Sequence, residues 1–254
     1  MVVGEIWRYP VKSMGGDQLD VAMLTADGVP GDRVVHVRDA GDVLTARSHP
    51  ALLGFHASLG PDGEPLVDGQ PWGSEVLAER LRGAVGPDVR LVRFDGPERF
   101  DVLPLLVATD GAIAALGLDR RRFRPNILVS GATADAERSW PGKRLRIGGA
   151  LIGVASLRQR CVMTTYDPDT QVQDVSILRR IVRERGGRLA LDCRVIEPGR
   201  VAVGDPVDVL EGRVVSYPDT SRSRRARRAA ARGSARWAPR SRIARAPGRG
   251  TADR

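Results

Sequence analysis

The chain has 254 residues, 42% of them hydrophobic, which suffices for one large or two small domains with a real core. Its two cysteines exclude a disulfide framework and a zinc finger, and no run approaches the ~20 apolar residues of a membrane span. The net charge of +9 arises in residues 214–254, which contain 12 Arg and two acidic residues and so carry +10. The rest of the chain has a net charge of −1, so the folded part offers no argument for nucleic-acid binding.

Short apolar segments between Gly, Pro and Asp turns predict a β-rich first half. Strands are predicted over residues 2–10, 19–25, 33–38, 43–45 and 89–94. Residues 39–42 are predicted to form the turn of a hairpin. One helix is predicted over residues 73–82, because Ser74 can cap it and its apolar residues recur every three to four positions.

The second half is predicted to mix strands with two helices. A strand at 105–108 precedes a helix at 111–118 capped by Asp110, and a loop from residue 122 enters the next strand. Gly148 and Gly149 join a predicted hairpin of residues 143–147 and 150–156. The clearest helix spans 174–185, where an apolar side forms from Val175, Ile177, Leu178, Ile181 and Val182. Strands at 189–197 and 206–210 close the fold, whose predicted class is mainly β with some α.

The two ends of the chain differ in composition. The N-terminus shows no basic segment followed by an apolar run, and two unlike cysteine contexts suit a reducing compartment, so a cytoplasmic location is expected. Residues 213–254 are rich in Arg, Ala, Ser and Pro and are predicted to be disordered. This tail is either a non-adaptive extension or a tether for an anionic membrane or nucleic acid.

Cys161 lies just past the strand predicted at 150–156, between Arg158 and Arg160 and the Asp-Pro-Asp turn at 167–169. Positive neighbours lower the pKa of a thiol, and the thiolate is the form that attacks or binds metal. A buried structural cysteine is the alternative. Cys193 lies inside an apolar strand and is expected to be a core residue.

The segment Arg160-Cys-Val-Met-Thr-Thr-Tyr-Asp-Pro-Asp-Thr170 resembles the motif of MOSC-domain proteins, a family that includes the amidoxime-reducing components and their bacterial homologues. The resemblance covers residues 2–210. It implies a β-barrel-like MOSC domain at 101–212 and a smaller N-terminal β-rich MOSC domain at 1–100. Gln171 departs from the family, which usually has Gly there, and this puts the local turn in doubt.

The resemblance implies a molybdenum–molybdopterin cofactor (Moco) with Cys161 as the protein's ligand to the metal. A soft thiolate suits molybdenum, and the phosphate and pterin need cationic and polar donors. The family motifs place Lys12, Ser13, Arg33, Thr45, Arg47, Thr109, Asp110, Arg124, Asn126 and Arg160 around this cofactor. Each also has a structural alternative, such as helix capping for Thr109 and Asp110. Asp167 or Asp169 is a candidate proton relay, with turn formation as the structural alternative for both.

The implied reaction is reduction of small N-hydroxylated compounds such as amidoximes, hydroxylamines and N-hydroxylated bases. Two cysteines cannot ligate an iron–sulfur cluster, so electrons must come from a separate protein. Two alternatives stay open. In the first, the fold is kept without the reductase activity: Cys161 carries sulfur as a persulfide, or the protein only binds the cofactor. In the second, the activity lies in the basic tail.

Overall fold

The computed structural model of the protein describes residues 1–94 and 96–212. The disorder predicted for residues 213–254 lies outside the described residues. Within them, strands outnumber helices, which confirms the mainly β class. No helix of the described part is long and apolar enough to cross a membrane.

The largest element is an eight-stranded mixed sheet with the order β15-β11-β12-β13-β9-β10-β1-β2. Its strands are β1 (Val2–Arg8), β2 (Asp17–Leu19), β9 (Leu105–Thr109), β10 (Ile127–Ser130), β11 (Arg144–Ile147), β12 (Ala150–Gln159), β13 (Arg188–Glu197) and β15 (Val207–Leu210). Only β9 and β10 pair in parallel; the other neighbours are antiparallel. β3 (Val21–Leu24) and β14 (Gly199–Ala202) form a separate pair.

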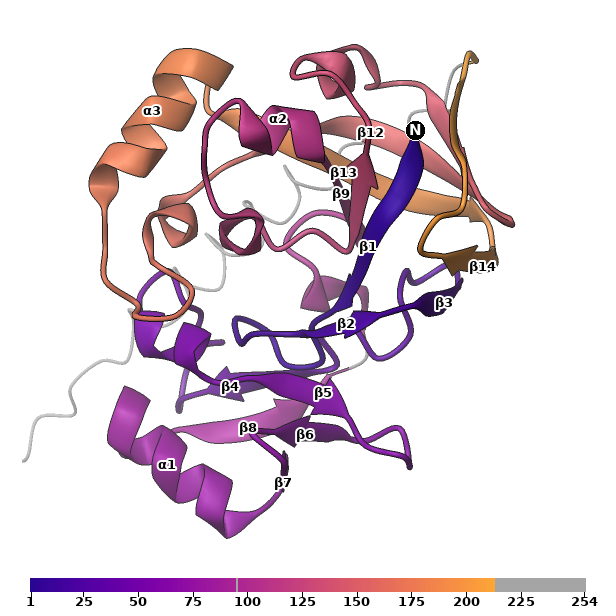
Figure 1. Cartoon of the computed structure of the whole chain (residues 1–254). Helices are drawn as coiled ribbons and strands as arrows, with labels where there is room; N and C mark the ends of the chain where they lie inside the picture. Colours follow the sequence, from indigo (N-terminus) through magenta and orange to yellow (C-terminus); the bar gives the residue numbers. More distant parts are fainter. Residues whose placement is uncertain (95, 213–254) are drawn as a thin grey trace, which may run out of the picture. The chain divides into compact units, whose positions relative to one another are not determined.

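The remaining short strands belong to the first half of the chain. They are β4 (Val35–Arg38), β5 (Ala57–Leu59), β6 (Pro65–Val67), β7 (Gln70–Pro71) and β8 (Arg90–Arg93). Figure 1 shows them together with helix α1 (Glu75–Val85), away from the large sheet. The predicted strand at 43–45 does not form, since only Val43 makes an isolated bridge, to Arg38.

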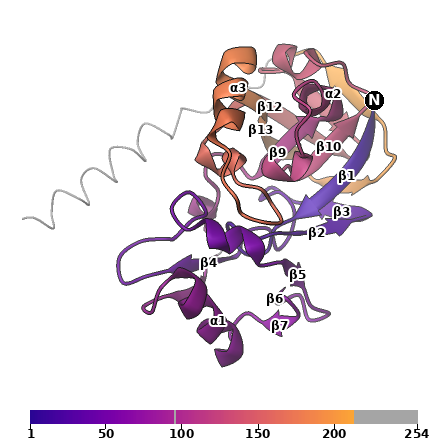
Figure 2. The ribbon, with the colours of Figure 1, turned by 60° about the vertical axis from the view of Figure 1, so that its left-hand side comes forward.

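Two helices pack beside the large sheet, as Figures 1 and 2 show. They are α2 (Asp110–Ala114) and α3 (Val175–Arg185). Ile177 and Ile181 bury one side of α3, as its pattern predicts. Val175 and Val182, predicted for the same side, are instead 47% and 56% exposed. The helix therefore covers the sheet with a narrower apolar stripe than its sequence offers.

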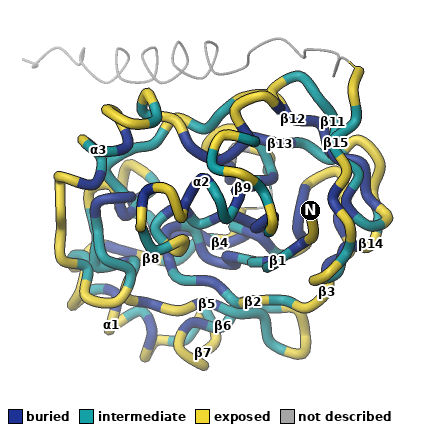
Figure 3. Tube along the Cα trace, turned by 45° about the horizontal axis from the view of Figure 1, so that its top comes forward, coloured by how far each residue is buried: buried dark blue, intermediate teal, exposed yellow. Residues whose placement is uncertain are grey.

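The core comprises three apolar clusters. One lies under the large sheet, one joins α1 to the short strands, and one lies beneath α2 and α3. Along the tube of Figure 3, buried segments follow the sheet strands, while loops and helix surfaces are exposed. Burial of this apolar surface is the main favourable term that holds the two halves in their fold.

Cys193 is confirmed as a core residue. It lies in β13, is fully buried and belongs to the cluster under the large sheet. Burial raises the pKa of its thiol well above the usual range, so it stays neutral.

Replacing Cys193 by Ala should therefore act on stability alone. Loss of one buried sulfur atom leaves a small cavity, and we expect the free energy of unfolding to fall by about 1 kcal/mol. Urea denaturation measures this change. A much larger loss, or any loss of ligand binding, would contradict a purely structural role.

Candidate cofactor site around Cys161

Cys161 lies two residues past the end of β12 and caps a short 3-10 helix, η5 (Val162–Thr165). Its carbonyl oxygen accepts a hydrogen bond from Thr164 Oγ1 at 2.9 Å. Its side chain is half-buried and makes no disulfide, unlike the buried and equally unpaired Cys193. The predicted position, just past a strand end and before a turn, is confirmed.

Two arginines flank the thiol. Arg47 and the Arg160 guanidinium both interact electrostatically with the sulfur of Cys161. Burial alone would lower the pKa of Arg47, but Asp101 and Cys161 outweigh it and raise that pKa. Burial lowers the pKa of Arg160 to about 10. Both groups are charged at neutral pH, so an ionised sulfur at this position has cationic neighbours.

A carboxylate, Asp101, connects Arg47 with two further cations. Its oxygens accept hydrogen bonds from Lys12 Nζ at 2.8 Å and from Arg47 Nη2 at 2.7 Å. Arg158 Nη2 lies 3.6 Å away, and Arg158 also pairs with Asp192 at 2.8 Å. Burial opposes ionisation, but Lys12 and Arg47 hold the pKa of Asp101 well below its usual range.

Tyr9 brings two more arginines to the same side. Its ring lies under Arg33 and Arg124, with guanidinium carbons 5.2 and 4.3 Å from the ring centroid. Burial lowers the pKa of Arg124 to about 10, and Arg124 interacts electrostatically with Arg33 and Asp101. Arg33 also forms an ion pair with the buried Asp32. We name the six cations the cation cluster: Lys12, Arg33, Arg47, Arg124, Arg158 and Arg160.

Several donors of this cluster have no protein acceptor. Among the described residues, Arg124 Nη2 and Arg160 Nε and Nη1 are buried atoms without a hydrogen-bond partner. Arg160 Nη2 donates to the Phe123 carbonyl at 3.0 Å, which fixes the side chain. Buried unpaired donors are costly, and charged ones more so. They are satisfied if an anionic or oxygen-rich ligand binds here.

Ser13, Asn126 and Thr45 use their polar atoms differently from the cation cluster. Ser13 Oγ accepts the Ala46 amide at 3.0 Å. Asn126 Oδ1 accepts the Leu106 amide at 3.1 Å, and its Nδ2 donates to the Trp7 carbonyl at 3.2 Å. Thr45 is half-buried, and its carbonyl accepts the His49 amide at 3.0 Å. These contacts show a scaffold role for Ser13 and Asn126.

Thr109 and Asp110 connect the start of α2 to neighbouring parts of the chain through hydrogen bonds. Thr109, not Asp110, caps α2 through its hydroxyl, which also donates to Glu137 at 3.1 Å. Asp110 accepts the amides of Gly131 and Ala132 at 2.9 and 3.2 Å. The predicted cap residue is therefore wrong by one position, because Asp110 holds the loop that follows β10.

Replacing Thr109 by Val should remove the cap and leave Glu137 short of a donor. We expect the free energy of unfolding to fall by about 1–2 kcal/mol. Thermal unfolding measures this loss, and retained molybdenum would show that the hydroxyl serves structure alone. Metal loss without a change of stability would assign Thr109 to the cofactor instead.

The turn after η5 forms despite Gln171. This residue adopts a left-handed backbone with φ of 58°, a conformation that favours glycine, and its side-chain amide donates to the Pro168 and Asp169 carbonyls. Asp167 pairs with Arg122 and Asp169 with Arg121, each at 2.7 Å. Both carboxylates thus hold the turn, which weakens the prediction of a proton relay.

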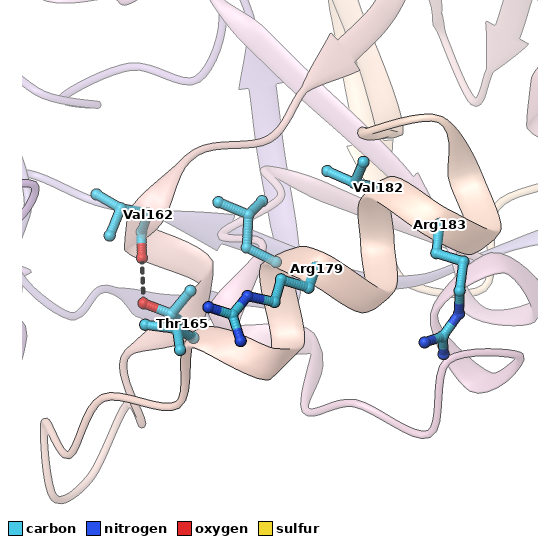
Figure 4. Close-up of a pocket in the computed structure, with 7 residues that line it drawn as sticks. Val162, Thr165, Arg179, Val182 and Arg183 are labelled. Atoms are coloured by element: carbon cyan, nitrogen blue, oxygen red, sulfur yellow. Dashed lines mark hydrogen bonds between the residues drawn. The ribbon is translucent and has the colours of Figure 1, made fainter.

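A shallow pocket of about 440 Å³ lies on the α3 side of η5 (Figure 4). Val162, Thr165, Leu178 and Val182 line it with the stems of Arg179 and Arg183. The Val162 carbonyl accepts the Thr165 hydroxyl at 2.6 Å at its edge. No residue of the cation cluster lines this pocket.

Asp101 and Tyr9 were missed as site residues by the sequence interpretation, and Arg158 was noted only as a neighbour of Cys161. Asp101 lies in the segment between β8 and β9, where no periodic pattern indicates its role. Tyr9 is the first residue of Tyr9-Pro-Val-Lys-Ser13, the segment that contains the predicted cofactor residues Lys12 and Ser13, and this position is the available indication.

Comparisons with known proteins identify the family to which this chain is similar. Residues 108–208 match the family model described as MOSC domain, and residues 1–87 match the MOSC N-terminal beta barrel domain. Human mitochondrial amidoxime-reducing component 1 is 27% identical over 82% of each chain, and human component 2 is 28% identical over 68% of each. The YUAD protein from Bacillus subtilis has a TM-score of 0.47 at 15% identity, covering 83% of this chain and 96% of its own.

Proposed function

The chain belongs to the MOSC family, and from that premise we propose that it is a molybdenum-cofactor-dependent oxidoreductase that reduces N-hydroxylated compounds. The amidoxime-reducing components among its relatives support the substrate class. The observation that carries the proposal is the set of buried, unpaired guanidinium N–H groups of Arg124 and Arg160 beside the half-buried thiol of Cys161.

The described residues fit such a cofactor. Cys161 would supply the soft thiolate ligand to molybdenum. Arg33 and Arg124, whose planar forks suit phosphate, would hold the anionic end together with Lys12. Arg160 would donate its unpaired N–H groups close to the metal, where it also neutralises the thiolate.

When bound, the cofactor would supply the two-electron redox chemistry that cleavage of the N–O bond requires. Overall, two electrons and two protons convert an N–OH group into N–H and release one water. The residues of the protein orient the cofactor and balance its negative charge. Arg47 and Arg160 would balance the negative charge of a thiolate ligand, and the nearby ion pairs of Asp101 and Asp192 fix the positions of the cations around it.

A separate protein would supply the electrons, because two cysteines cannot hold an iron–sulfur cluster of four thiolates. A cytoplasmic setting keeps thiols reduced and so suits a free Cys161. Thr109, Asp110, Ser13, Thr45 and Asn126 enter this proposal as scaffold residues around the cofactor.

Metal and pterin analysis of the purified full chain tests the proposal, followed by an amidoxime-reduction assay with a chemical reductant. We expect molybdenum near one per chain and turnover to the amidine. Cyanide-releasable sulfur on Cys161 without molybdenum would instead favour a sulfur carrier. Salt-sensitive binding of nucleic acid that disappears with residues 213–254 would move the activity to the tail.

A further inference from the structure

Asp101 occupies the position that an anionic ligand of Lys12 and Arg47 would take. Its Oδ1 accepts from Lys12 and its Oδ2 from Arg47, so each oxygen faces a different cation. Its side chain is about one-third exposed, at 32%, and lies in the segment that links β8 to β9. It is therefore reachable from solvent and is not part of a strand or helix.

The contacts of Lys12 show how far this carboxylate engages the cation. Lys12 Nζ donates to Asp101 and also to the Arg99 carbonyl at 2.9 Å, which uses two of its three N–H groups. Its side chain is only 14% exposed, so few positions remain from which an anion can approach. A phosphate oxygen that binds Lys12 must share it with the carboxylate or replace the carboxylate.

The difference from Arg124 and Arg160 is informative. Those two arginines keep buried N–H groups without an acceptor in the described chain, whereas Lys12 and Arg47 have a carboxylate between them. The cation cluster thus has one part with unpaired donors and one part that a carboxylate of the protein already neutralises.

We propose that Asp101 is an internal counter-anion that competes with anionic ligands for Lys12 and Arg47 and thereby sets the affinity of the site for phosphate-type anions. The inference rests on the anion-binding part of the proposed function and not on its redox chemistry. Asp101 also stabilises the ligand-free protein, since without it Lys12, Arg47 and Arg158 repel one another.

Replacing Asp101 by Asn tests this directly in the ligand-free full chain. Inorganic pyrophosphate is the probe, and its dissociation constant is measured by calorimetry at low ionic strength, where charge interactions are least screened. We expect Asp101→Asn to bind pyrophosphate about tenfold more tightly than the unaltered protein, because a charge-assisted competitor is gone. Its unfolding temperature should be lower than that of the unaltered protein.

Two matched variants make the result specific. Asp68→Asn changes the net charge equally but removes a carboxylate that pairs with Arg80, remote from Lys12 in the sequence and in its contacts. Lys12→Gln removes a cation of the site, and the binding that it retains measures pyrophosphate held without Lys12, including any held by the Arg-rich residues 213–254. We expect Asp68→Asn to leave the affinity unchanged and Lys12→Gln to weaken it.

Three outcomes would overturn the inference. Weaker or unchanged binding by Asp101→Asn would make Asp101 an organiser of the site, and an equal gain in Asp68→Asn would reduce the effect to net charge. Absence of Lys12-dependent binding in both proteins would remove the anion site itself. Molybdenum bound through Cys161 in any of these cases would leave the proposed enzyme standing, so the two failures are distinguishable.

Discussion

Replacement of Cys161 by Ser should lower the molybdenum content of the purified protein roughly tenfold or more. The serine oxygen is a harder ligand than the cysteine sulfur and suits molybdenum less well. Since this sulfur is the one protein ligand that the proposal assigns to the metal, amidoxime reduction should fall in proportion. Inductively coupled plasma mass spectrometry gives the metal content per chain.

Cys193→Ala is the matched control for this change, because it also removes a thiol but from the buried core. It should keep its molybdenum and its activity while losing a little stability. If Cys161→Ser retains the metal at the level of this control, molybdenum is held elsewhere and the proposed site is wrong.

Replacement of Arg160 by Met should stabilise the cofactor-free protein and weaken its binding of the cofactor. Nε and Nη1 are buried without an acceptor in the described chain, and burial lowers the pKa of the guanidinium to about 10. Met removes these unpaired donors at similar volume, at the cost of the bond to the Phe123 carbonyl. We expect the cofactor-free protein to gain about 1 kcal/mol and the cofactor affinity to fall roughly tenfold or more.

Denaturation of the cofactor-free protein and pterin content after purification measure the two effects. Arg179→Met is the control, since Arg179 is an exposed arginine on α3 and its loss should alter neither quantity. An Arg160→Met protein that is destabilised and still retains the pterin would show that this arginine serves the fold.

The elements that could be predicted are those whose pattern is local. The hairpin at Gly148 and Gly149, α1 with its Ser74 cap and the helix α3 all form as expected. β14 was missed because its four residues gain their structure by pairing with β3, some 180 residues away in the chain. Such a pairing leaves no local trace in the sequence.

The site divides in the same way. The role of Cys161 and its position past a strand end could be predicted from a sequence motif. The same holds for the arginines that belong to family motifs. Asp101 was not, because its role depends on Lys12, Arg47 and Arg158, which lie far from it in sequence and meet only in the fold. Conversely, Thr109 and Asn126 were expected at the cofactor, yet their polar atoms hold Glu137 and backbone groups.

The position of β1 limits how this protein can be divided. Although it opens the chain, it pairs with β10 and lies between β10 and β2, while Val3 and Ile6 belong to the core under that sheet. A fragment starting near residue 101 would present the bare edge of β10 with an uncovered apolar face, which invites aggregation. We therefore expect that the C-terminal half does not fold by itself, and that a shortened version for expression needs the first strand or a substitute for it in trans.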